Sequence, residues 1–120
     1  VYMDSLFIRI GSQPAVDAVV DLLYDKMIVD KRVAHFFAVI DVDRQRKMQK
    51  SFLTTAFGGP DHYVGRDMRM SHKHLNLEKK DFMAVAEIIR DCMKELGVPK
   101  ELIHEADDVV MSQYGKIMNR

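Results

Sequence analysis

Hydrophobic residues recur at every third or fourth position along nearly the whole chain, and this spacing limits what the chain can fold into. Over residues 78–96, for example, Phe82, Ile89 and Met93 fall on one face of a helix. A half-buried strand would need apolar and polar residues to alternate, and no segment sustains that alternation. The pattern therefore predicts an all-α protein.

Glycine and proline residues divide this pattern into separate helices. Four long helices are predicted, over residues 14–29, 43–57, 78–96 and 99–118. Shorter helical turns are predicted before Gly11, around residues 31–37 and around residues 67–74. With 120 residues, no internal repeat and no linker-like stretch, the chain is expected to form a single domain over residues 1–120.

The charges of the chain balance, since Lys and Arg number 18 and so do Asp and Glu. A net charge of zero argues against general electrostatic attraction to nucleic acid or to an anionic membrane. No stretch approaches the ~18 consecutive apolar residues of a membrane span, and the first residues do not resemble a signal peptide. Cys92 is the only cysteine, which excludes an internal disulfide. We therefore expect a soluble, cytoplasmic monomer that binds neither nucleic acid nor membranes.

The helix predicted over residues 43–57 has an unusual inner face. Asp43 is expected to cap this helix, while Arg46 and Thr54 are expected to point away from the core. The predicted inner face consists of Gln45, Met48, Gln49, Phe52, Leu53 and Ala56. Two glutamines therefore interrupt an otherwise apolar stripe.

These glutamines need polar partners if they are buried. Burying a side-chain amide without a partner costs about 1–3 kcal/mol, so a polar group should meet Gln45 and Gln49. Tyr24, on the inner stripe of the first long helix, also needs a partner for its hydroxyl. If they face one cavity, these three side chains would suit a small polar ligand. Alternatively, the two amides lie at the edge of the core and reach water.

His72 is another polar residue on an apolar face, between Met68 and Leu75 at spacings of four and three. Such a histidine binds a metal through one ring nitrogen, or it is simply a hydrogen-bonded core residue. His74 would point elsewhere on the same helix, so the two histidines make a poor chelate. No motif of a zinc protease, a phosphate-binding loop or a serine hydrolase occurs in the chain.

Several short segments follow one another in a characteristic order. They are the run from Ala15-Val16 to Leu23-Tyr24, Phe36-Phe37, Gln45-Arg46 with Gln49, the run from Phe52 to Pro60, Tyr63, Gly65-Arg66 with Met68 and His72, and Leu96-Gly97-Val98-Pro99. In this order and spacing, residues 5–118 resemble the group I truncated haemoglobins of bacteria, ciliates and green algae. The chain departs from that family at Gly11-Ser12, where two glycines are usual. Because serine tolerates a positive φ poorly, we expect the first turn to differ slightly.

The resemblance implies a two-over-two helical sandwich around one haem b group. Carried over residue by residue, it makes His72 the proximal ligand of the haem iron. It makes Tyr24 the distal residue that donates a hydrogen bond to the gas ligand. Gln45 and Gln49 would orient that tyrosine or contact the ligand themselves.

The resemblance also implies a shell of residues in contact with the haem. These residues are Phe37, Arg44, Met48, Phe52, Arg66, Met68 and Leu75. Arg44 and Arg66 would pair with the propionates, unless they are free surface charges. Met48 either fills an apolar gap or binds the iron itself. Phe36 is expected in the core.

Two functions follow from the resemblance. The first is reversible binding of dioxygen, carbon monoxide and nitric oxide, for the storage or transport of oxygen. The second is nitric oxide dioxygenation, which yields nitrate and requires electrons from an external reductase. A third reading, a helical interaction module without haem, would leave the tyrosine, the two glutamines and His72 without a common purpose.

Overall fold

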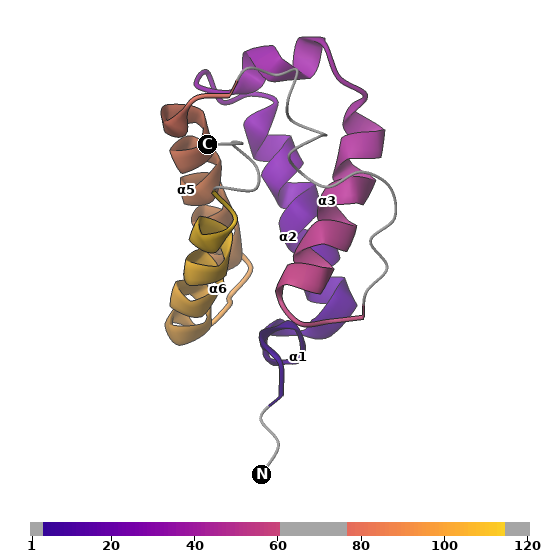
Figure 1. Ribbon diagram of the computed structural model, residues 1–120, viewed down its shortest axis with the longest axis vertical. Coiled ribbons are helices and arrows are strands. Elements are labelled where there is room, and N and C mark those ends of the chain that lie inside the picture. The colour runs from indigo at the N-terminus through magenta and orange to yellow at the C-terminus, as the bar shows by residue number, and fades with distance from the viewer. Residues whose placement is uncertain (1–3, 61–76, 115–120) are drawn as a thin grey trace.

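In the computed structural model, which describes residues 4–60 and 77–114, every regular element is a helix (Figure 1). The elements are α1 (Leu6–Ile10), α2 (Ser12–Met27), the 3₁₀ helix η1 (Ala34–Ala38), α3 (Val42–Ala56), α5 (Lys79–Glu95) and α6 (Lys100–Ser112). Helix α2 lies beside α3, α6 lies beside α5, and the two pairs meet where α2 packs on α5. For the described residues, the prediction of an all-α protein is confirmed.

The helix ends lie close to where the sequence pattern predicts them. Both ends of the first three long helices fall within two residues of the predicted ends. The fourth begins one residue later than predicted and ends at Ser112, with Gln113 as its cap, short of the predicted end at residue 118; positions 115–118 lie outside the described residues. The turn predicted around residues 67–74 also lies outside them. Gly97, which has a φ of 81°, follows the end of α5 as expected.

The cap of α3 is Asp41, so the prediction of Asp43 at that position is wrong. The Asp41 carboxylate accepts a hydrogen bond from the backbone N–H of Arg44 at 3.1 Å. Asp41 has an extended backbone, which directs its side chain toward the first turn of the helix. Asp43 lies within that turn and is therefore unable to serve as its cap.

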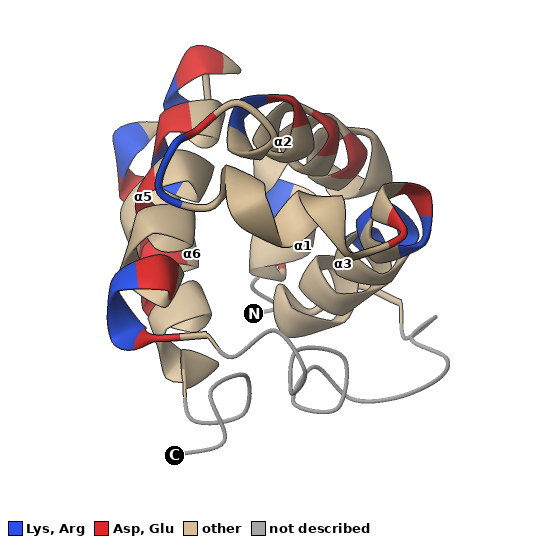
Figure 2. Cartoon of the chain, turned by 90° about the horizontal axis from the view of Figure 1, so that it is seen from above, with Lys and Arg blue, Asp and Glu red and all other residues tan. Residues whose placement is uncertain are grey.

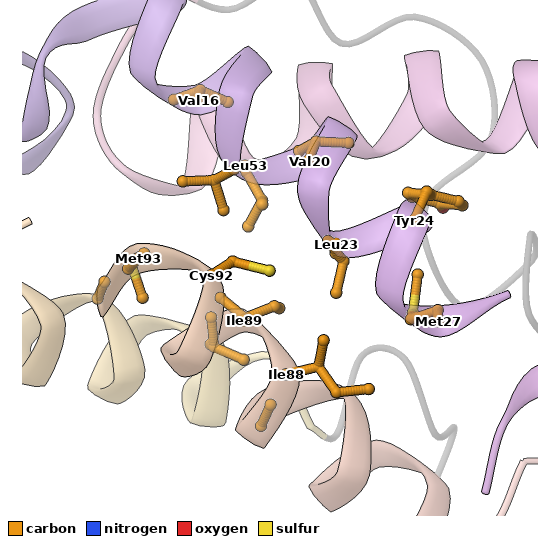
Figure 3. Close-up of a cluster of buried hydrophobic side chains, with 14 of the residues drawn as sticks. Val16, Val20, Leu23, Tyr24, Met27, Leu53, Ile88, Ile89, Cys92 and Met93 are labelled. Atoms are coloured by element: carbon orange, nitrogen blue, oxygen red, sulfur yellow. The ribbon is translucent and has the colours of Figure 1, made fainter. Parts of the chain in front are cut away.

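The core forms where three helices meet (Figure 3). It includes Val16, Val20 and Leu23 of α2, Ile89, Cys92 and Met93 of α5, and Leu53 of α3, all of them at most 3% exposed. Full burial of one large aliphatic side chain contributes about 1.5–3 kcal/mol, before the loss of conformational entropy is counted. This cluster therefore holds α2 against α5 and α3.

Thr54 is 1% exposed, which contradicts the prediction that it points away from the core. Its Oγ1 accepts a hydrogen bond from Nε2 of Gln13 at 3.1 Å, and Gln13 also donates to Asp17 at 2.9 Å. The beginning of α2 packs against the end of α3 at this point. The buried side of α3 is therefore wider there than a single apolar stripe suggests.

Most charged positions of α2 and α3 lie on the outer sides of these helices, and mainly uncharged stretches, drawn tan, face the middle (Figure 2). Some charges join different helices: Arg9 pairs with Glu105 at 2.6 Å, and Arg90 pairs with Asp107 at 2.7 Å. Exposed pairs of this kind contribute about 0–1 kcal/mol each, so the apolar core dominates stability. Among the described residues, no helix is both long and apolar enough to cross a membrane.

The junction of α1 and α2 contains two consecutive residues with positive φ. Gly11 has a φ of 120° and donates its backbone N–H to the carbonyl oxygen of Ile8 at 3.1 Å. Ser12 has a φ of 63°, which is uncommon for a residue with a side chain. The left-handed turn is therefore formed although serine replaces the glycine that is usual there.

Replacing Ser12 with Gly should raise the free energy of unfolding by about 0.5–1 kcal/mol, because glycine adopts a positive φ without steric cost. Chemical denaturation of both proteins measures the difference. Ser51→Gly, inside α3, is the matched control and should lower stability by about 0.5 kcal/mol. A loss of stability on Ser12→Gly would contradict the strain assigned to this turn.

Candidate functional site

A cavity lies between the two pairs of helices, with about 930 Å³ of empty space including the part open to solvent. Helices α2, α3, α5 and α6 and the 3₁₀ helix η1 all contribute to its walls. Most of the lining is apolar, and it includes Leu23, Met27, Val85, Ile89 and Val109. Polar groups enter this lining at a few positions only, which is typical of a small-molecule site.

Tyr24 brings a polar group to the apolar wall. It is presented by the last two turns of α2 and is only 5% exposed. Its ring meets the Phe37 ring edge-on, with the centroids 5.9 Å apart. Burial raises the pKa of the Tyr24 phenol well above its ordinary value, so the hydroxyl keeps its proton at neutral pH. No other described residue forms a hydrogen bond with this hydroxyl, which remains available to a ligand.

Gln45 and Gln49 add two amides to the same cavity. They lie one turn apart on α3, and both are half-buried. Among the described residues, neither side chain has a hydrogen-bond partner. The three side chains singled out from the sequence therefore line one cavity, as a phenol and two amides with free donors.

Some of the other residues predicted to contact the haem line the cavity, and some do not. Phe37 and Phe52 line the cavity, and so does Phe36, which is half-buried and was expected in the core. Arg44 is exposed and Met48 is half-buried. Neither Arg44 nor Met48 is among the described residues that form the cavity wall.

The residues predicted to bind the iron and to contact the haem on the side of His72 belong to a segment that the structure does not describe. His72, Arg66, Met68 and Leu75 all lie outside the described residues. Within residues 4–60 and 77–114, no group of three or more His, Cys, Asp or Glu side chains could hold a metal ion.

The sequence prediction missed two polar side chains of the lining, Asp81 and Gln113, and it missed the contact of Arg46 with the Tyr24 ring, although Arg46 itself does not line the cavity. Asp81 lines it from the first turn of α5, is 6% exposed, and accepts a hydrogen bond from the backbone N–H of Glu78 at 2.9 Å. The spacing of Glu78 and Asp81 is that of a capping box, which is a signal visible in the sequence. Arg46, expected to point away from the core, instead lies with its guanidinium carbon 5.4 Å from the centroid of the Tyr24 ring.

Comparison with known proteins gives the family. Residues 5–119 match the family described as bacterial-like globin. The group 1 truncated haemoglobin of Synechocystis is 47% identical over 107 residues, covering 86% of each chain. That of Tetrahymena pyriformis is 42% identical over 106 residues, covering 88% of each chain.

Solved structures agree with this family in their fold. A ferric form of the Tetrahymena pyriformis truncated haemoglobin, a Tyr-to-Phe variant, has a TM-score of 0.90 at 38% identity and covers 95% of this chain and 97% of that chain. The 2/2 haemoglobin of a Synechococcus species, in the cyanomet state with covalently attached haem, has a TM-score of 0.90 at 36% identity. That match covers 98% of this chain and 100% of the other. The predicted two-over-two sandwich is thereby confirmed.

Other Tetrahymena structures carry a glutamate in place of a glutamine at one of two positions. Together with the substituted tyrosine, these positions have the same separations along the chain as Tyr24, Gln45 and Gln49. The family match, the identities and the shared fold lead to one conclusion: the chain belongs to the group 1 truncated haemoglobins.

Proposed function

We propose that the cavity receives one haem b group and that the chain binds dioxygen and other diatomic gases there. The observation that carries this proposal is the buried Tyr24 side chain, which lines an apolar cavity and whose hydroxyl has no hydrogen-bond partner among the described residues. Haem, when bound, supplies an iron centre that coordinates a diatomic gas. The protein supplies the pocket and the hydrogen-bond donors around it.

The composition of the cavity suits this ligand. Its apolar and aromatic walls, including Phe37 and Phe52, fit the flat apolar body of a porphyrin. An unmet buried hydroxyl costs about 1–3 kcal/mol, and a ligand that accepts a hydrogen bond removes that cost. Tyr24 stays protonated, so it donates to a gas molecule that carries partial negative charge.

The proximal side rests on the family resemblance. By this resemblance, His72 would hold the iron, Met68 and Leu75 would form the apolar wall beside it, and Arg66 would pair with a propionate. Arg44, the other residue proposed to pair with a propionate, is exposed and is not among the described residues that line the cavity. Met48 lies off the described cavity wall, which favours packing over iron ligation.

The donor set favours retention of the gas over rapid delivery. One phenol and two amides can each donate to a bound molecule, and each such bond must break before the molecule leaves. Nitric oxide dioxygenation would use the same donors but would also need a reductase to supply electrons. Sustained consumption of nitric oxide that depends on an added reductase would identify that second activity.

Replacing Tyr24 with Phe should speed dioxygen release by roughly tenfold to a hundredfold. The change removes one hydrogen bond to a partly charged ligand, worth about 1.5–3 kcal/mol, and keeps the buried ring. Stopped-flow displacement of dioxygen by carbon monoxide measures the rate. Tyr114→Phe is the matched control, because Tyr114 packs on Phe82 and is not among the described residues that line the cavity. Unaltered release from Tyr24→Phe would refute this role of the hydroxyl.

Replacing His72 with Ala should weaken haem retention and remove the iron–histidine vibration from the resonance Raman spectrum of the ferrous protein. Transfer of haem to an excess of an apoglobin acceptor measures retention. His74→Ala is the control and should retain haem normally, because its side chain is predicted to point elsewhere. A His72→Ala variant with an unchanged spectrum and unchanged retention would exclude His72 as the ligand.

A further inference from the structure

Arg46 makes three contacts with a single turn of α2. Its Nη1 lies 3.0 Å from Oδ1 of Asp21, and its Nη2 lies 4.0 Å from Oδ1 of Asp25. Its guanidinium carbon is 5.4 Å from the centroid of the Tyr24 ring, between those two acidic residues in the sequence. With 25% of its side chain exposed, Arg46 is less exposed than Arg9, Arg32 and Arg90, the other arginines that form ion pairs among the described residues.

Lys50 pairs with the same aspartate as Arg46 but does not contact the Tyr24 ring. It lies one turn beyond Arg46 on α3, is 26% exposed, and pairs with the same Asp21 at 3.1 Å. No described contact joins Lys50 to Tyr24. Both cations therefore join α3 to α2, but only Arg46 also places a planar cation over the aromatic ring. A cation within about 6 Å of a ring centroid is attracted to the face of the ring.

The Tyr24 ring is thus held on two sides. The guanidinium of Arg46 lies over the ring, and the Phe37 ring meets it at an interplanar angle of 76°. Gln45 immediately precedes Arg46, so one turn of α3 supplies both an amide to the cavity and a cation to the tyrosine. Burial raises the pKa of the Tyr24 phenol, and the positive charge of Arg46 acts in the opposite direction. A lower pKa makes the phenol a stronger hydrogen-bond donor.

We propose that Arg46 is a positioning residue, which holds the Tyr24 ring so that its hydroxyl meets the gas ligand. The inference rests on the proposed function, because it assigns Arg46 an effect that passes through the Tyr24 hydroxyl. The ion pairs with Asp21 and Asp25 fix the guanidinium, and the guanidinium in turn fixes the ring. Gas retention should therefore depend on a residue that is not among the described cavity lining.

The test compares Arg46→Met in the natural protein and in the Tyr24→Phe variant, both loaded with haem. Arg46→Met should speed dioxygen release by roughly threefold to tenfold, the scale expected for loss of one cation–aromatic contact. It should also shift the C–O stretching frequency of the carbon monoxide form in the infrared spectrum. In the Tyr24→Phe background, the same substitution should change neither quantity.

Two further variants complete the experiment. Lys50→Met is the matched control: it removes an ion pair to Asp21, leaves the ring contact, and should alter dioxygen release by less than about twofold. Arg46→Lys keeps the charge without the planar group, and it provides a folded comparison if Arg46→Met does not fold. Release from Arg46→Lys should be faster than from the natural protein.

The outcomes separate the inference from the proposed function. An effect of Arg46→Met that persists in the Tyr24→Phe background, or an equal effect of Lys50→Met, would overturn the positioning role. Natural release rates in Arg46→Lys would overturn it as well. If Tyr24→Phe alone changes nothing, the donor role of Tyr24 fails, and the role of Arg46 fails with it.

Discussion

The packing of α2 between α3 and α5 is the contact on which the rest of the structure depends. Leu23 of α2 is fully buried against the cluster that includes Ile89 of α5 and Leu53 of α3 (Figure 3). Tyr24 is the next residue along the chain, so the packing that forms the core also sets the phenol in the cavity wall. The ion pair of Asp21 with Arg46 ties the same turn to α3. Core and site are therefore built from one helix contact.

The polar part of the cavity is kept apart from the solvated surface. Most charged residues of α2 and α3 lie on their outer sides (Figure 2), and the two helices give the cavity a neutral phenol and two neutral amides. The carboxylate of Asp81, which also lines the cavity, accepts a hydrogen bond at the beginning of α5. Neutral donors cost less to bury than charged ones, and in an apolar setting they interact strongly with a polar ligand.

The sequence predicted most of the helical fold, because helix ends are marked by residues that act locally, such as Gly97. It predicted less well where the outcome depends on a neighbouring helix. Thr54 is buried because the beginning of α2 covers it. Arg46 turns toward α2 because its contacts, the Tyr24 ring among them, lie on that neighbouring helix. Gln45 and Gln49 could be proposed as site residues because two amides on the apolar stripe of one helix are unusual. His72, taken from the resemblance, stays a prediction.

The most direct test is a titration of the purified apoprotein with haem, followed by its visible absorption. We predict that uptake saturates at one haem per chain, and that the reduced product changes its spectrum reversibly with dioxygen. Uptake should protect the chain against thermal unfolding, because a ligand that binds only the folded state stabilises that state. Absorption that rises without saturation, together with an unchanged unfolding temperature, would contradict the existence of a haem site in this cavity.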